Sequence, residues 1–137
     1  MYDPVKWQET EVFRNTNVPE RVRIVSDGFE ALMKKHGLEN EGHFFRFLPD
    51  CKKDTVIALF CHMGLGNCLL SRITGAALPV VWHTFFLPTT SVTTVQFEVF
   101  NCCPEVCIPR ITSLGDVSHL AAGNEPISSS GFHCRLE

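Results

Sequence analysis

Hydrophobic residues recur every three or four positions between residues 18 and 36, which is the spacing of one face of an α-helix. The apolar positions are Val22, Val25, Phe29, Leu32 and Met33. Asn17 can cap the start of this helix while Glu20 reaches back to it, and Pro19 is tolerated in a first turn. Gly37 can adopt the left-handed conformation that ends a helix. The pattern predicts a helix over residues 18–36.

Two hydrophobic runs without helical spacing follow this segment. Residues 43–48 form a short aromatic run that ends at Pro49, and residues 55–61 are almost wholly apolar. An antiparallel strand with one solvated face alternates apolar and polar residues, whereas a strand covered on both faces by helices loses its polar positions. Residues 55–61 therefore predict an interior strand, and with the helices they indicate an α/β fold with a mostly parallel sheet flanked by helices.

The pattern after residue 61 predicts a second helix and a short, less regular segment. Asn67 can cap a helix that continues to about residue 74, where Gly75 ends it. Residues 79–86 are expected to be helical or irregular.

Two further strands are predicted at residues 90–100 and 106–114. The first is rich in threonine, valine and phenylalanine, which favour strands. Pro109 places the second near a sheet edge, because proline cannot donate a ladder hydrogen bond. The two strands are expected to pair through a turn at residues 101–105.

Length and composition fit one globular domain over residues 1–137. The chain has 137 residues, of which 45% are hydrophobic and 20% are charged. Residues 1–16 have no clear period and are expected to form an irregular arm, in which Trp7 and Phe13 dock on a neighbouring surface. Residues 121–137 are expected to form a tail.

The charge pattern argues against nucleic acid and membrane partners. The formal net charge is -3, and the basic residues are scattered instead of forming a stripe. No apolar run reaches the roughly 18 residues that a membrane helix needs. The polar first residues lack a signal-peptide pattern, so a cytoplasmic location is expected.

Seven cysteines raise the question of disulfides or a metal site. Their number is odd and no export signal is evident, so reduced thiols are expected. A zinc site could be assembled from Cys102, Cys103 and Cys107 together with His133-Cys134. Because the spacings match no common zinc motif, the sequence predicts no metal.

The candidate chemistry lies at His62, which follows the apolar run 55–61 and precedes Gly64-Leu65-Gly66. In an open parallel sheet, ligands bind beyond the carboxyl ends of the strands, and a turn into a helix presents free backbone N–H groups. A protonated imidazole there can offset the charge of a phosphoryl group. The competing interpretation is a histidine that merely caps the end of a strand or bonds a carbonyl.

The segment Cys61-His62-Met63-Gly64 between a strand and a helix resembles the element that carries the second catalytic histidine in the histidine phosphatase superfamily, phosphoglycerate-mutase-like branch. Further similar segments follow in order: Trp82-His83, Pro88 to Thr94 and Gly115 to Leu120. The resemblance implies the C-terminal part of a three-layer phosphatase fold. It also implies phosphomonoester hydrolysis without metal or cofactor, acting on a phosphorylated small molecule.

The resemblance assigns roles residue by residue. His62 would stabilise the phosphoryl group, backbone N–H groups near Gly64 would bind its oxygens, and His83 and Ser91 would line the pocket. For His83, packing beside Trp82 is the competing interpretation.

The nucleophile of the resembled family is missing from this chain. That histidine lies in an Arg-His-Gly motif, and the similar Lys35-His36-Gly37 is expected to end a helix, where the dipole disfavours phosphate. The chain alone is therefore expected to be inactive or weak as an enzyme. Two alternatives are a non-catalytic phosphate-binding or interaction module and, less favoured, a Cys/His metal-binding regulatory domain.

Self-association is also expected. The strand that would carry the Arg-His-Gly motif would lie beside residues 55–61, so its absence would leave an apolar strand edge open to another chain.

Overall fold

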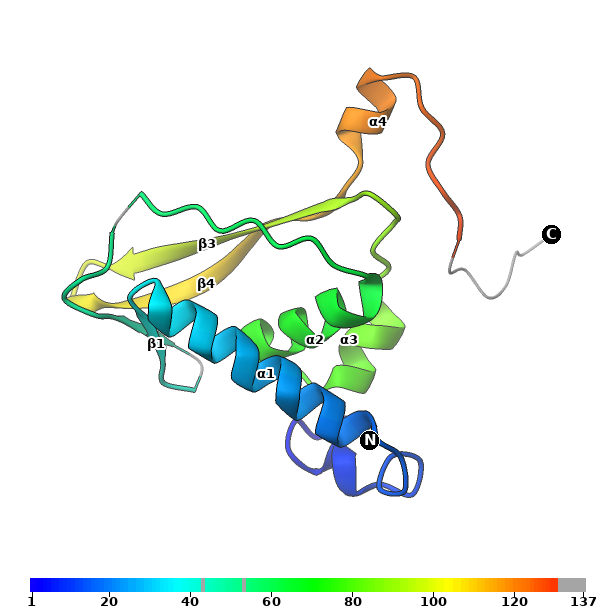
Figure 1. Ribbon diagram of the computed structural model, residues 1–137, viewed down its shortest axis with the longest axis horizontal. Helices are drawn as coiled ribbons and strands as arrows, with labels where there is room; N and C mark the ends of the chain where they lie inside the picture. The colour runs from blue at the N-terminus through cyan, green and yellow to red at the C-terminus, as the bar shows by residue number, and fades with distance from the viewer. Residues whose placement is uncertain (43, 53, 131–137) are drawn as a thin grey trace.

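The computed structural model describes residues 1–42, 44–52 and 54–130, in which helices pack below a small sheet (Figure 1). The helices are the 3-10 turn η1 (Lys6–Glu9), α1 (Val18–Lys35), α2 (Met63–Thr74), α3 (Leu78–Thr84) and α4 (Ser118–Ala122). The strands are β1 (Leu38–Asn40), β2 (Phe45–Phe47), β3 (Val92–Phe100) and β4 (Cys103–Asp116).

Helix α1 confirms the prediction for residues 18–36. Its apolar face buries Phe29 and Met33, and Gly37 follows with a φ of 83°, so the left-handed stop is formed. The predicted capping is only partly right. Asn17 occupies the N-cap position without a side-chain cap hydrogen bond, and the Glu20 carboxylate accepts hydrogen bonds from Arg23 instead of reaching back.

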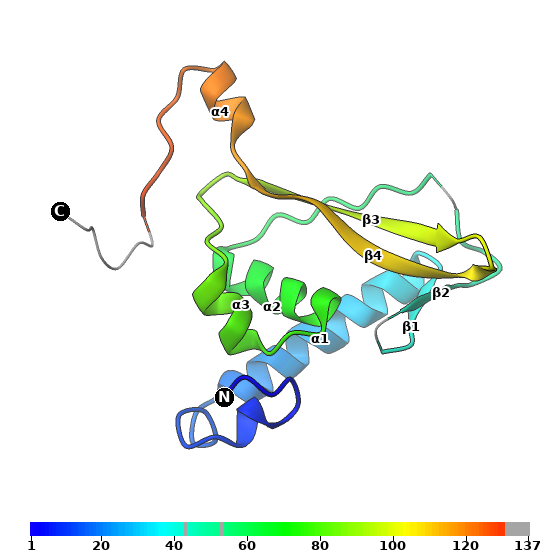
Figure 2. The same cartoon turned by 180° about the vertical axis from the view of Figure 1, so that it is seen from behind.

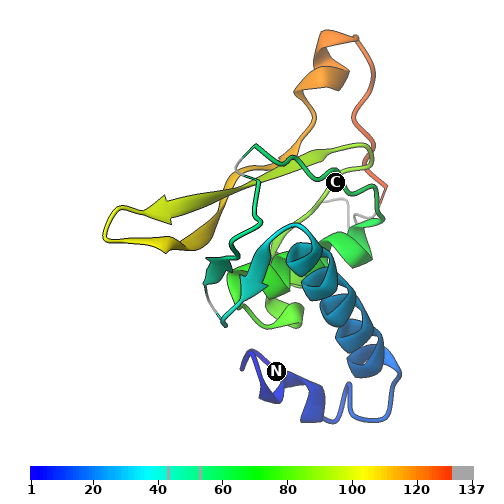
Figure 3. The same cartoon turned by 60° about the vertical axis from the view of Figure 1, so that its left-hand side comes forward.

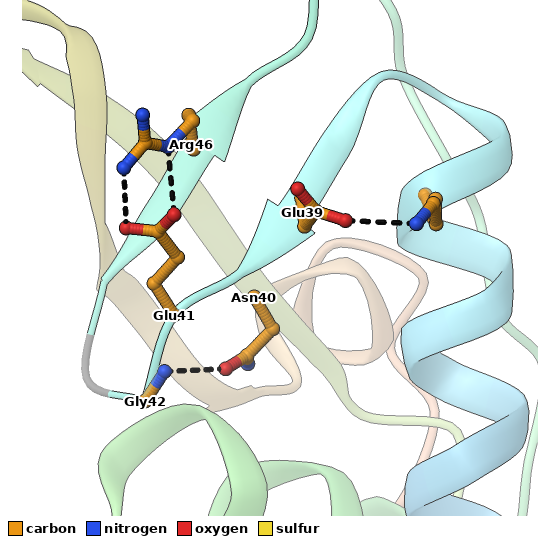
Figure 4. A network of polar contacts seen from close by, with 6 residues as sticks. Glu39, Asn40, Glu41, Gly42 and Arg46 are labelled. Atoms are coloured by element: carbon orange, nitrogen blue, oxygen red, sulfur yellow. Dashed lines mark hydrogen bonds and ion pairs between the residues drawn. The ribbon is translucent and has the colours of Figure 1, made fainter.

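Strands β1 and β2 form an antiparallel pair directly after α1, with Leu38 opposite Phe47. Polar contacts surround their turn (Figure 4): Arg46 donates two hydrogen bonds to Glu41, and the Gly42 N–H donates to the Asn40 side chain. Lys34 of α1 donates to Glu39 of β1, which links the helix to the strand. The aromatic run at residues 43–48 thus contains β2, which ends before Pro49.

The four strands form one sheet in the order β1-β2-β4-β3, and every neighbouring pair is antiparallel. The prediction of a mostly parallel, three-layer sheet is therefore wrong. Parallel neighbours need a long crossover connection, whereas β3 and β4 are joined by a tight turn after Phe100. Beyond Cys107 strand β4 pairs only with β3, so Pro109 lies on a stretch with one open edge.

Residues 55–61 form no strand, and this removes the element on which the parallel prediction depended. They run as an extended connection between β2 and α2 (Figures 1 and 2). Val56 is 91% exposed and Phe60 is 98% exposed, and only Ile57 packs against the core. A continuous apolar run is typical of a strand that helices cover on both faces. Val56 and Phe60 are exposed, so residues 55–61 are not covered in this way.

Two hydrophobic clusters hold the described elements together. The larger joins α1 and the sheet through Phe29, Met33, Leu38, Phe45 and Cys107, and α2 packs against it through Leu69 and Ile73. The Phe45 and Phe97 rings pack edge to face, with centroids 5.0 Å apart. The smaller cluster contains Trp7, Ala77 and Leu78, so the N-terminal arm docks through Trp7 as expected.

Helix α2 ends as predicted, since Gly75 follows Thr74 with a φ of 70°. Its start differs from the prediction: the N-cap is His62, and Asn67 lies inside the helix. Helix α4 projects away from the other helices, and the chain that follows it turns back (Figure 3). Within the described residues, no helix has both the length and the apolar character needed to cross a membrane.

Candidate functional site

The first turn of α2 is the place where the structure puts the predicted chemistry. His62 is the N-cap, with extended backbone angles (φ −84°, ψ 160°), and its carbonyl accepts a hydrogen bond from the Gly66 N–H at 3.0 Å. The backbone N–H groups of residues 63–65 have no backbone acceptor in the part of the chain that is described. They are the free donors expected at the start of a helix.

The His62 side chain is exposed and makes no cap hydrogen bond. No other described residue hydrogen-bonds to its imidazole. The competing interpretation, a histidine whose side chain only bonds a carbonyl, is therefore not what the structure shows. An exposed imidazole beside free N–H groups can approach an anion without first breaking a bond within the protein.

Gly64 and Gly66 allow close packing against this turn. A Cβ atom at Gly64 would lie 3.2 Å from the Trp82 ring of α3, and one at Gly66 would lie 3.1 Å from Leu87. Helix α3 and the loop after it therefore press against the first turn of α2. Gly64 has a packing role, in addition to any role of the nearby N–H groups toward a ligand.

Within the described residues, no hydrogen bond or ring contact joins His62 to His83 or Ser91. His83 lies in the last turn of α3, where it lines a cavity of about 160 Å³ with Phe13, Leu78, Pro79 and Trp82. This lining is mostly apolar, so the interpretation of His83 as a neighbour of Trp82 fits it better than phosphate binding. Ser91 lies just before β3, and its N–H donates to the Pro88 carbonyl.

The strand that precedes the histidine in the resembled element is not formed here. Residues 55–61 are extended but unpaired, so His62 does not lie at the carboxyl end of a strand. The tripeptide Lys35-His36-Gly37 ends α1 as expected, with His36 as the C-cap.

The prediction of Asn67 as a helix cap is wrong. Its side chain is fully buried in α2, and neither its nitrogen nor its oxygen has a hydrogen-bond partner in the described structure. Buried amides are normally satisfied, so this residue is unusual. Asn67 lies three residues before Leu70, which is buried, so the two share the inward face of the helix. This helical spacing is the pattern from which the burial of Asn67 could have been predicted.

The six described cysteines are free thiols, and burial separates them chemically. Burial, and to a lesser extent the neighbouring Cys51, raises the pKa of Cys107 to about 11. Burial also raises the pKa of Cys68. In the described residues, no group of three or more His, Cys, Asp or Glu side chains could hold a metal ion. His133 and Cys134 of the considered zinc site lie outside those residues.

Comparisons of the chain with protein-family models, curated proteins and solved structures found no match.

Proposed function

We propose that this chain binds a phosphate-like oxyanion at the start of α2 and acts as a non-catalytic binding module. The observation that carries the proposal is the exposed, unbonded imidazole of His62 at the N-cap of a helix of 12 residues. A helix N-terminus presents free N–H groups and the positive end of the helix dipole, both of which favour an anion. When protonated, His62 adds a full positive charge to these donors.

The residues present favour binding over phosphoryl transfer. Covalent phosphoryl transfer needs a nucleophile, and the Arg-His-Gly motif that carries it in the resembled family is missing from this chain. The site is also open, so water is not excluded from it. Phosphomonoester hydrolysis by a longer protein that contains this chain stays a prediction.

Titration with inorganic phosphate, followed by NMR, tests the binding proposal. The amides of residues 62–67 should shift first, and His62→Ala should weaken the binding. His119→Ala is the matched control, because His119 is an exposed histidine on the separate helix α4.

Two results would contradict the proposal. Shifts that begin at residues 102–107 would place the anion elsewhere. Hydrolysis of para-nitrophenyl phosphate by the purified chain should not exceed that in buffer. Turnover that His62→Ala abolishes would replace the binding module with an enzyme.

A further inference from the structure

Two adjacent cysteines lie at the tip of the β3–β4 hairpin. Cys102 belongs to the turn, and Cys103 is the first residue of β4, paired across the turn with Phe100. Both are exposed. Figure 3 shows this end of the hairpin projecting away from the helices, so reagents in solution can reach both sulfur atoms.

Cys102 and Cys103 do not follow each other along a regular strand. Adjacent residues of a strand point to opposite faces of a sheet, so adjacent cysteines ordinarily point apart. Here Cys102 lies in the turn and only Cys103 belongs to β4, so this alternation does not apply to the pair. Hydrogen bonding to Cys102, followed by the charge of Cys102, raises the pKa of Cys103.

The other described cysteines lack this combination of exposure and a neighbouring thiol. Cys107 is buried, and Cys51 and Cys68 are partly buried. Cys61 is exposed, but neither of its neighbours in the chain is a cysteine. The hairpin tip is thus the place where an external oxidant meets two thiols at once.

We propose that Cys102 and Cys103 are a modification site at which a small-molecule disulfide, such as glutathione disulfide, reversibly oxidises the pair to a vicinal disulfide. The Cys102 thiolate attacks one sulfur of the reagent, the reagent S–S bond breaks, and one glutathione thiolate leaves and takes up a proton. Cys103 then loses its proton and attacks the Cys102 sulfur, which expels the second glutathione thiolate. Two protein thiols are oxidised, and one disulfide is reduced to two thiols.

The expected bond is easily reversed because of where the two residues lie. The Cα atoms of adjacent residues are about 3.8 Å apart across a trans peptide, below the usual range of about 4.4 to 6.8 Å for disulfides. Such a bond is strained, and strained, exposed disulfides are the labile ones. The pair is therefore suited to a reversible modification and poorly suited to a permanent cross-link.

Peptide mapping of the full chain tests the proposal directly. After treatment with glutathione disulfide, the free thiols are alkylated and the chain is cleaved after glutamate. Cleavage at Glu98 and Glu105 yields residues 99–105, a peptide whose only cysteines are Cys102 and Cys103. We expect this peptide to lose two hydrogen atoms and to resist alkylation, and a thiol reductant should restore both thiols.

Matched variants separate the pair from single reactive thiols. Cys102→Ser and Cys103→Ser should each abolish the internal disulfide, whereas Cys61→Ser should leave it unchanged. As an independent measurement, one equivalent of phenylarsine oxide, which bridges two neighbouring thiols, should protect both cysteines from alkylation. Glutathione retained on the peptide, a disulfide between two chains, or full alkylation of both cysteines after oxidation would each overturn the proposal.

Discussion

Gly37 connects α1 to β1, and its backbone conformation and surroundings disfavour any residue that has a Cβ atom. Its φ of 83° lies in the left-handed region that L side chains rarely adopt. A Cβ atom there would also lie 2.5 Å from the Cys51 Cα and 2.9 Å from the Cys51 nitrogen, which are backbone atoms that cannot turn aside. The close contact ties the end of α1 to the chain that follows β2.

Gly37→Ala should therefore lower the free energy of unfolding. The left-handed backbone and the overlap with Cys51 together should cost about 2 to 4 kcal/mol. Urea unfolding followed by circular dichroism measures this loss. Gly28→Ala is the matched control, because Gly28 lies within α1 with nothing within 4 Å of an added Cβ.

The control should change stability in the opposite direction. Alanine is favoured over glycine inside a helix, so Gly28→Ala should raise the free energy of unfolding by up to about 1 kcal/mol. Equal effects of the two substitutions would show that the turn at Gly37 is not as tight as the structure indicates.

At the scale of elements, an ion pair joins the two longest helices. Arg72 of α2 donates from its Nε and Nη2 atoms to Glu30 Oε1 of α1, at 2.8 and 2.6 Å. The Arg72 and Glu30 side chains are 27% and 43% exposed, so water screens this pair less than it screens an ordinary surface pair.

A double-mutant cycle with Arg72→Met and Glu30→Gln should give a coupling free energy of about 1 kcal/mol. The control cycle uses Arg23 and Glu20, which form an ion pair within α1 and are 61% and 58% exposed. Its coupling should be clearly smaller, and it should fall further in high salt. If the control pair couples as strongly as Arg72 and Glu30, the helix contact adds nothing to the ion pair.

Helices and strands that depend on a local pattern were predictable from the sequence. Those that depend on contacts with the rest of the fold were not. The helical spacing of Val22 to Met33 placed α1, and the threonine- and valine-rich segment placed β3. Residues 55–61 were misassigned because a continuous apolar run carries no alternation that distinguishes a strand from an extended connection. The prediction of a parallel sheet was wrong for the same reason, because it depended on residues 55–61 being an interior strand.

The candidate site was predictable only as a position along the chain. His62 caps α2, and Gly75 ends it as predicted, but Gly64 and Gly66 lie inside the helix and not in a turn before it. Its relation to His83 and Ser91 depends on how α3 and the loop after it fold, which no local pattern specifies. Asn67 shows the same limit: a residue that is a good cap in sequence lies buried within the helix instead.

At the scale of the whole molecule, the connection at residues 55–61 is the most exposed hydrophobic feature among the described residues. Val56 and Phe60 are almost fully in water, and none of the backbone groups of residues 56–61 has a hydrogen-bond partner in the described structure. The segment is uncharged and lacks proline and glycine, which is the composition of chains that pair as strands. The original reason for expecting self-association, a sheet edge left open, does not hold, but this exposed segment supports the same expectation.

We expect the chain to associate with itself through residues 55–61 as its concentration rises. Burying Val56 and Phe60 would contribute about 3 to 6 kcal/mol per chain, part of which the entropy of association offsets, so the complex should be weak. Sedimentation at several concentrations measures it, and Val56→Ser with Phe60→Ser should shift the chain toward monomer. Val5→Ser with Val12→Ser is the control, since these exposed valines lie in the N-terminal arm. A chain that stays monomeric throughout, or a control that dissociates equally, would rule out this segment as the interface.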